Sequence, residues 1–155
     1  MPEVTGGLFL SDLPGRDESF ELDRAEIASH GISTVVCLAS SEEIQAASPD
    51  YFQAINGGSL SWQQVSVPMN DGDGMRHLRG VLEAIEDCVA TLRAGRNVLV
   101  HCIGGIGKTG TFGIGILIGI GLDVLEASVR VTDAEAGPES GAQEALIEQI
   151  VQARV

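Results

Sequence analysis

A thiol, an ammonium group and a hydroxyl stand close together around a cluster of glycines in the second half of the chain. Residues 101–109 read HCIGGIGKT, and an apolar run at 98–100 precedes them. Glycines permit the positive φ angles and the close backbone approach that a ring of inward-pointing N–H groups needs. A strand before such a loop and a helix after it add the positive end of a helix dipole. The segment therefore predicts an anion-binding cradle with Cys102 at its mouth.

Two chemistries fit such a cradle. In the first, the Cys102 thiol is a nucleophile, available as thiolate near neutral pH because N–H donors and a helix N-terminus favour its negative charge. In the second, the loop binds a nucleotide, because residues 107–109 copy the end of the G-x-x-x-x-G-K-S/T motif. The first glycine of that motif would fall on Cys102, and no apolar strand ends in an aspartate that could hold Mg²⁺. The sequence therefore favours the cysteine chemistry, with a nucleotide site as the alternative.

The same segment resembles the H-C-x5-R-S/T signature of the cysteine-dependent tyrosine and dual-specificity phosphatases. LFLSDLPG at 8–15 resembles the opening of compact members related to kinase-associated phosphatase. GISTVVCL at 31–38 resembles their early core strand, and VPMNDG at 67–72 resembles the P-x-x-D-G loop of the general acid. The resemblance covers nearly the whole chain. It implies one α/β phosphatase domain over residues 1–155, with a central, mostly parallel twisted sheet flanked by helices on both sides.

The resemblance implies a role for each part of the cradle. Cys102 is expected to attack phosphorus, while Lys108 and the backbone N–H groups of the loop bind the phosphate oxygens. The other phosphate-binding residues are Ile103, Gly104, Gly105, Ile106 and Gly107. His101 is expected to be a hydrogen-bonded, structural histidine that tunes the thiolate. Thr109 is expected to donate a hydrogen bond to the sulfur, and it is also expected as the N-cap of the following helix.

A general acid, a water-positioning residue and a redox partner are also implied. Asp71 is expected to protonate the leaving oxygen and then to activate water on the phosphocysteine, in preference to Asp73. Gln143 resembles a glutamine that some members place near the hydrolytic water. Cys37 is expected to pack in the core, with a reversible disulfide to Cys102, as in some relatives, as the alternative. The resemblance implies no metal ion and no organic cofactor.

Lys108 is the one departure from the signature, since the family has arginine at this position. Arginine binds phosphate through two parallel N–H donors, whereas an ammonium group is a compact point charge. We therefore expect weaker phosphate binding and slower phosphoryl transfer, which depends on stabilising the equatorial oxygens. Three explanations stay open: drift in a degenerate protein, a deliberate replacement of arginine, and a natural variant tuned to another phosphate geometry.

Composition limits the class of protein and its partners. The chain has 155 residues, of which 44% are hydrophobic, as is typical of a globular domain. Its net charge of −13 argues against nucleic acid and anionic membrane surfaces as partners, and it means that the cradle must hold an anion locally. Three widely spaced cysteines and the lack of an N-terminal secretory signal favour the reducing cytosol. We expect a cytoplasmic monomer.

Periodicity and turn residues predict the elements that position these residues. Strands are expected at 8–10, 33–38, 62–67 and 98–100, and helices at 21–30, 42–47, 76–92, 109–120, 123–132 and 140–153. The segment 48–61 is expected to be loop, with a turn of helix at 51–54. The glycine-rich helix at 109–120 is expected to pack closely against the sheet, and its apolar run is too short to span a bilayer.

The sequence thus predicts a phosphatase that hydrolyses phosphomonoesters through a phosphocysteine intermediate. Its substrate is expected to be a phosphorylated protein or a small phosphate ester, and phosphotyrosine, phosphoserine, phosphothreonine and lipid phosphates all stay open. One alternative is a catalytically impaired module that binds phosphate or phosphoproteins. The other is the nucleotide-binding loop.

Overall fold

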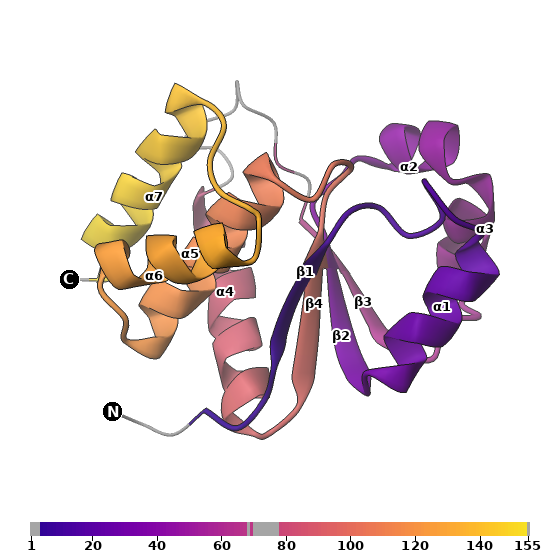
Figure 1. Ribbon diagram of the computed structural model, residues 1–155, viewed down its shortest axis with the longest axis horizontal. Helices are drawn as coiled ribbons and strands as arrows, with labels where there is room; N and C mark the ends of the chain where they lie inside the picture. Colours follow the sequence, from indigo (N-terminus) through magenta and orange to yellow (C-terminus); the bar gives the residue numbers. More distant parts are fainter. Residues whose placement is uncertain (1–3, 68, 70–77, 155) are drawn as a thin grey trace.

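The computed structural model describes residues 4–67, 69 and 78–154, and a parallel sheet lies at its centre (Figure 1). The sheet of these residues has four strands, in the spatial order β1 (Leu8–Ser11), β4 (Asn97–His101), β2 (Ile32–Cys37) and β3 (Gln63–Ser66). All neighbouring strands are parallel, and Ser11 and Cys37 both pair with His101. The carboxyl ends of three strands therefore meet beside the residue that precedes Cys102.

Helices cover both faces of the sheet (Figure 1). One face carries α1 (Phe20–Ser29), α2 (Ser41–Ala47) and α3 (Pro49–Gly57), and the other carries α4 (Leu78–Arg93), α5 (Gly107–Ile120), α6 (Val124–Asp133) and α7 (Gly141–Arg154). Successive strand residues alternate between the two core clusters: Val35 packs on the α1–α3 side and Val36 on the α4–α7 side. The predicted α/β architecture, with helices on both sides of a parallel sheet, is confirmed.

Local sequence signals account for most of the helix ends. The Ser19 side chain accepts a hydrogen bond from the Leu22 N–H at the start of α1. Asp123 Oδ1 accepts one from the Glu126 N–H, 2.8 Å away, at the start of α6, as predicted. Gly31 follows α1 with a φ of +65°, which favours glycine. Apart from the segment after α2, the predicted elements lie within two residues of the observed ones wherever the structure describes them.

The prediction of a loop over 48–61 is wrong for most of that segment. The chain forms α3 there, with Pro49 in its first turn and Gly58 as a left-handed cap at a φ of +65°. Proline favours the first turn of a helix and glycine the position after its last residue, so both residues mark helix ends here. The helix buries Tyr51 completely, and this side chain reaches the candidate site.

Helix α5 is apolar around its whole circumference and is almost completely buried. A Cβ atom on Gly115 would lie 2.7 Å from Ile85 Cδ1 of α4, and one on Gly119 would lie 2.9 Å from Val89 Cγ2. These two glycines therefore allow α4 to approach closely. The expected packing against the sheet is found at Gly113, where a Cβ atom would lie 3.3 Å from Leu10 Cδ2 of β1. Among the described residues, no helix has both the length and the apolar character needed to cross a membrane.

Candidate active site

The candidate site lies where β4 ends and α5 begins. Cys102 follows the last residue of β4, and α5 starts at Gly107, two residues before the predicted start. The loop borders a cavity of about 350 Å³. Its lining residues come from this loop and the start of α5, from the connection after β2 and α2 itself, and from the region around α7. They are Ala39, Glu43, Cys102, Ile103, Gly104, Ile106, Gly107, Lys108, Glu139 and Gln143. The carboxyl edge of a parallel sheet is the usual place for a ligand in such folds.

Two hydrogen bonds end on the sulfur of Cys102. The Thr109 hydroxyl donates to Sγ at 3.0 Å, and the Gly105 N–H donates to Sγ at 3.3 Å. Cys102 is 6% exposed and Thr109 is fully buried, so both bonds lie largely out of water. Donors aimed at sulfur favour its anionic form. Ile106 holds the N-cap position of α5, and no side chain caps this end, so the expected N-cap role of Thr109 is wrong.

A chain of hydrogen bonds behind the loop fixes the tautomer of His101. The Trp62 indole N–H donates to Gln64 Oε1 (2.8 Å), which leaves Gln64 Nε2 to donate to the Tyr51 hydroxyl (2.7 Å). The Cys102 carbonyl can only accept, so His101 carries its proton on Nδ1 and donates to that carbonyl at 3.1 Å. Nε2 of the neutral ring is then an acceptor, and the Tyr51 O–H donates to it across 2.7 Å.

The imidazole at the end of this chain is completely buried. Burial lowers the pKa of His101 to about 4, against a smaller opposing effect of its hydrogen bond to the Cys102 carbonyl. Burial also raises the pKa of the Tyr51 hydroxyl well above its usual range. Both side chains are therefore neutral near pH 7. Tyr51 lies in the segment predicted as loop, so sequence reasoning missed its contact with the site.

The segment after β1 supports the loop from one side. The Leu13 N–H and the Arg16 guanidinium both donate to the Ile103 carbonyl, at 3.0 and 3.1 Å. Gly105 has a φ of +74°, and a Cβ atom there would lie 2.7 Å from the Asp12 backbone nitrogen. Only glycine fits this position without strain. Sequence reasoning missed Arg16, because nothing local links it to residues 103–105.

The turn before α7 supports the loop from the other side. The Gly137 N–H donates to the Ile106 carbonyl at 3.1 Å, and the Glu139 N–H donates to Gln143 Oε1 at 2.7 Å. A Cβ atom on Gly107 would lie 2.7 Å from Glu139 Oε1 and 2.8 Å from Gln143 Oε1. The structure thus brings Gln143 to the cavity, and it adds Glu139, which the sequence did not indicate.

Other predicted site residues lie elsewhere. Cys37 packs in the core cluster on the α1–α3 side, whereas Cys102 belongs to the cluster on the α4–α7 side. Both are free thiols, and burial raises the pKa of Cys37 to about 11. The structure therefore places Cys37 as a packing residue, with no disulfide to Cys102. Asp71 and Asp73 lie outside the described residues.

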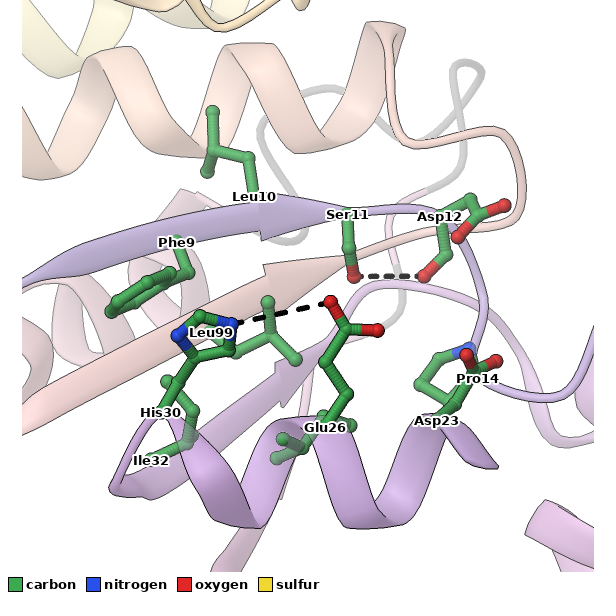
Figure 2. A pocket seen from close by; sticks show the side chains of 11 residues that line it. Phe9, Leu10, Ser11, Asp12, Pro14, Asp23, Glu26, His30, Ile32 and Leu99 are labelled. Carbon is green, nitrogen blue, oxygen red and sulfur yellow. Dashed lines mark hydrogen bonds and ion pairs between the residues drawn. The ribbon is translucent and has the colours of Figure 1, made fainter. Parts of the chain in front are cut away.

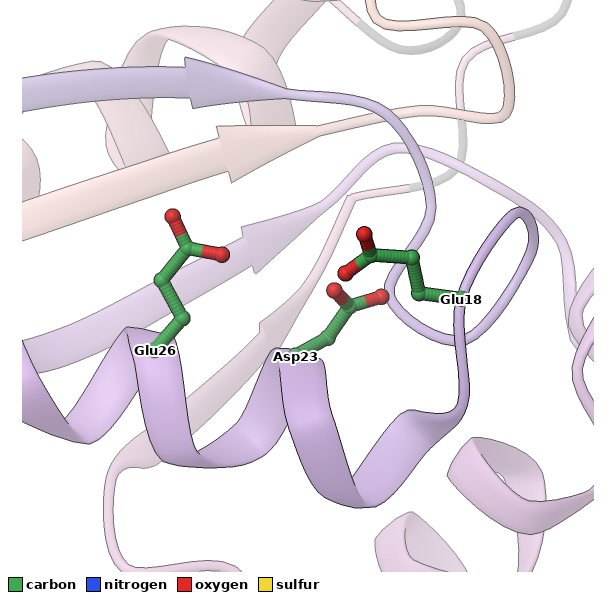
Figure 3. A group of neighbouring side chains, drawn as sticks. All are labelled: Glu18, Asp23 and Glu26. Carbon is green, nitrogen blue, oxygen red and sulfur yellow. The ribbon is translucent and has the colours of Figure 1, made fainter.

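A second cavity, of about 300 Å³, lies between β1 and α1 (Figure 2). His30, the residue after α1, contacts the Phe9 ring at a centroid distance of 5.2 Å, and its Nε2 lies 4.0 Å from Glu26 Oε1. On the α1 side of this cavity, Asp23 and Glu26 stand near Glu18, with carboxylate oxygens within 4.8 Å of one another (Figure 3). This acidic group borders the connection from β1 to α1 that supports the cradle.

Asp12 belongs to that connection. Burial, a hydrogen bond with Asp17 and the charges of Asp17 and Asp23 raise the pKa of the Asp12 carboxyl to about 6, while Arg16 acts in the opposite direction. Asp23 is itself held in place, since its Oδ2 accepts the Gly15 N–H at 2.7 Å. The connection beside the cradle is therefore sensitive to pH through Asp12.

Solved structures share this fold. A crystal structure of kinase-associated phosphatase with its catalytic-site cysteine substituted by serine has a TM-score of 0.78 at 19% identity, covering 94% of this chain and 86% of that one. The human tyrosine phosphatase-like serine/threonine/tyrosine-interacting protein has a TM-score of 0.72 at 21% identity, covering 96% and 94%. Tk-PTP in its active form has a TM-score of 0.68 at 23% identity, covering 97% and 95%.

Sequence comparison gives the family. No curated protein matches the chain significantly. A family model described as "PTP-SAK: Swiss Army Knife protein, DSP-PTPase phosphatase domain" matches residues 14–147, which include the cradle and the elements around it. Because this match spans most of the chain, the protein belongs to the DSP-PTPase phosphatases, the family of dual-specificity and tyrosine phosphatases.

Proposed function

We propose that the protein hydrolyses phosphomonoesters through a phosphocysteine intermediate on Cys102. One observation carries this proposal: the Cys102 sulfur accepts hydrogen bonds from the Thr109 hydroxyl and the Gly105 N–H beside a cavity that Lys108 lines. This arrangement suits a thiolate nucleophile next to a bound tetrahedral anion. The family assignment favours it over a nucleotide-binding loop.

In the first step, the Cys102 thiolate attacks phosphorus and the bond from phosphorus to the ester oxygen breaks. The N–H groups of residues 103–108 and the Lys108 ammonium hold the equatorial oxygens. The first N–H groups of α5 are free for this purpose, since a helix leaves them without an internal acceptor. We assign the proton for the leaving oxygen to Asp71, on the resemblance of its segment to the family's acid loop.

In the second step, water attacks the phosphocysteine, the sulfur–phosphorus bond breaks, and inorganic phosphate leaves. The sulfur departs as a thiolate, which the Thr109 hydroxyl stabilises across 3.0 Å. We assign the positioning of water to Gln143, which lines the cavity. Phosphate charge is neutralised by backbone N–H groups and Lys108, so we propose a reaction that needs no metal ion. Three free thiols support a reducing compartment, the cytosol.

The lysine at position 108 supports a second candidate function. An ammonium group cannot bind two phosphate oxygens in the bidentate way of a guanidinium, so turnover depends on a weaker contact. A protein with this site and negligible turnover would bind phosphorylated proteins without hydrolysing them. It would still belong to the same family.

Phosphate release from p-nitrophenyl phosphate in the presence of EDTA tests the proposal. We expect release by the chain as it stands and none by Cys102→Ser, which keeps the fold and the cavity. A burst of p-nitrophenol equal to the enzyme concentration would identify the covalent intermediate. Activity that survives Cys102→Ser would refute the phosphocysteine route. If the protein binds phosphopeptides but no preparation releases phosphate, the result would favour the second candidate function, a domain that binds phosphorylated proteins without hydrolysing them.

A further inference from the structure

The charges around the cradle are unusual for a site that receives a dianion. Of the described residues that line the cavity, Lys108 carries the one positive side chain, while Glu43 and Glu139 carry negative ones. The thiolate of Cys102 adds another negative charge in the proposed mechanism. The Arg16 guanidinium donates to the Ile103 carbonyl of the loop but is not among these lining residues. A phosphate therefore enters a cavity whose lining side chains are negative in sum, and this balance bears on which esters the site accepts.

The position of Glu139 is determined by its backbone. The Gly137 N–H bonds to the Ile106 carbonyl, and the Glu139 N–H bonds to Gln143 Oε1, so the turn before α7 is held against the cradle. Its carboxylate lies beside Gly107, where a Cβ atom would be 2.7 Å from Oε1. Glu139 is nevertheless exposed, which leaves its carboxylate open to a ligand.

Neither Glu139 nor Lys108 takes part in an ion pair within the described part of the chain. Neither charge is therefore neutralised by an ion pair among those residues. A carboxylate that lines the cavity disfavours a dianion there, and a positive charge on the ester itself offsets this penalty.

Glu43 places a second carboxylate on the cavity from a different element. It lies in the first turn of α2, where Oε1 accepts the Ser40 N–H at 3.0 Å as part of a capping box. That bond already fixes the orientation of the Glu43 carboxylate, so the side chain loses little conformational freedom when a ligand binds. Since Glu43 is half-buried and already hydrogen-bonded, its contribution to a ligand is smaller than that of Glu139.

We infer that the site selects phosphomonoesters whose alcohol portion carries a cationic group next to the phosphate, with Glu139 as the main specificity-determining residue and Glu43 as a second one. This inference rests on the proposed function and names its substrate class. A phosphorylated residue flanked by arginine or lysine has this chemistry, and so does the phosphate ester of a small amino alcohol. The net charge of −13 also favours the approach of a cationic substrate.

Matched substrates test the inference. One pair is a phosphotyrosine peptide with arginine on both sides and the same peptide with glutamate there. The other is an amino-alcohol phosphate and its N-acetylated form. We expect kcat/KM to be at least about tenfold higher for the cationic member of a pair, and the preference to shrink as salt is raised. If only the peptide pair shows the preference, the substrate is a phosphorylated protein with basic neighbours. If both pairs show it, a cationic group beside the phosphate is sufficient, whether or not the substrate is a protein.

Glu139→Gln should lower kcat/KM for the arginine peptide, because it removes the attraction between the carboxylate and the arginines. It should raise kcat/KM for the glutamate peptide, because it removes the repulsion between the carboxylate and the glutamates. Glu43→Gln should do the same to a smaller extent. Glu86→Gln is the matched control, since it changes the same charge on the exposed surface of α4, outside the cavity. Equal kcat/KM for both peptides, or equal effects of Glu139→Gln on both, would overturn the inference.

A binding measurement separates this inference from the proposed function. Cys102→Ser binds substrates without turnover, so titration calorimetry with the same peptides needs no catalysis. At least tenfold tighter binding of the arginine peptide supports the inference even if the wild-type chain releases no phosphate, which would contradict only the proposed turnover. Release from p-nitrophenyl phosphate together with equal affinities would contradict the inference and leave the proposed function intact.

Discussion

The hydroxyl oxygen of Tyr51 lies 2.7 Å from Nε2 of His101, on the side of the cradle that faces α3. The Cys102 carbonyl accepts the Nδ1 proton of the neutral imidazole, so Nε2 is unprotonated and accepts the tyrosine proton. Gln64 Nε2 donates to the same hydroxyl. A residue from a helix on one face of the sheet thus positions the backbone of the candidate nucleophile.

Tyr51→Phe should destabilise the fold without changing the tautomer of His101. It leaves His101 Nε2 without a donor and Gln64 Nε2 without an acceptor, and such losses cost about 1–3 kcal/mol of unfolding free energy. Urea unfolding followed by Trp62 fluorescence measures the cost. Nitrogen NMR shifts should show the Nδ1–H tautomer in both chains, because the Cys102 carbonyl still accepts the Nδ1 proton in the variant.

A control for this change is Thr91→Val, which removes a hydroxyl bonded to the Asp87 carbonyl on the exposed side of α4. It should change the unfolding free energy by about 0.5 kcal/mol or less. An imidazole of His101 that titrates near pH 6.5 in the wild-type chain would contradict the neutral, buried state described above.

Thr109→Val should slow the breakdown of the phosphocysteine more than its formation. The substitution keeps the shape of the side chain and removes the donor that stabilises the departing thiolate. A hydrogen bond to a charged group contributes about 1.5–3 kcal/mol, so a decrease of about 10- to 100-fold in kcat is expected. Rapid-quench kinetics should show the intermediate accumulating, and Thr109→Ser should restore the rate. An unchanged kcat would rule out this role.

Gly105→Ala should disrupt the cradle, whereas Gly104→Ala should leave it nearly intact. At Gly105 the φ of +74° is strained for alanine, and the added Cβ would lie 2.7 Å from backbone atoms of the segment after β1. At Gly104 the nearest atom to an added Cβ is Arg16 Nη1, at 3.9 Å. Strain of about 1–3 kcal/mol corresponds to a loss of about 10- to 100-fold in phosphate affinity. Vanadate inhibition measures that affinity, and equal effects of the two substitutions would contradict the prediction.

Lys108→Arg should strengthen phosphate binding and raise turnover. A guanidinium can donate two parallel N–H bonds to phosphate oxygens, and one additional charge-assisted bond is worth about 1.5–3 kcal/mol. The expected gain in kcat/KM for p-nitrophenyl phosphate is therefore about tenfold or more. A loss of activity would instead indicate that the cavity is shaped around lysine, which favours a natural variant tuned to another phosphate geometry.

Asp12→Asn should stabilise the protein above pH 6 and have little effect near pH 4. The Asp12 pKa is about 6 in the folded chain, chiefly through burial, against 3.8 as its ordinary value. Between these values the folded state holds a proton that the unfolded state releases, so this group lowers stability as pH rises from about 4 to 6 and remains unfavourable above that range. Asparagine removes the penalty.

Thermal unfolding at pH 4 and pH 7.5 measures this effect as the difference in Tm between variant and wild type. His101 acts in the opposite direction: because its pKa is about 4 in the folded chain, stability falls as pH drops below 6.5. This contribution is the same in variant and wild type, so it cancels when their Tm values are subtracted at each pH. The same Asp12→Asn gain at both pH values would contradict the raised pKa. Asp87→Asn on the exposed surface of α4 serves as the charge-matched control.

Much of the site was predictable because its central part is continuous in sequence. The cradle residues are neighbours along the chain, so strand, glycines, cysteine and helix start could be recognised together. Caps such as Asp123 and apolar periodicity in α4 are local signals of the same kind. The segment of α3 was misjudged because Pro49 and Gly58 can mark either a loop or the two ends of a helix, and only the burial of Tyr51 decides between them.

Apart from α3, the sequence by itself determined where along the chain the strands and helices lie, and it determined the cradle and its cysteine, because each of these depends on residues close to one another in the chain. The tertiary structure alone decided that Tyr51 orients His101, that Arg16 holds Ile103, and that Glu139 lies beside Gly107. Those contacts join segments far apart in the chain, and their distances follow from the packing of helices on both faces of the sheet. The charges that surround a ligand in the cavity are consequently set by the tertiary structure, whereas the reactive sulfur can be identified from the local sequence motif.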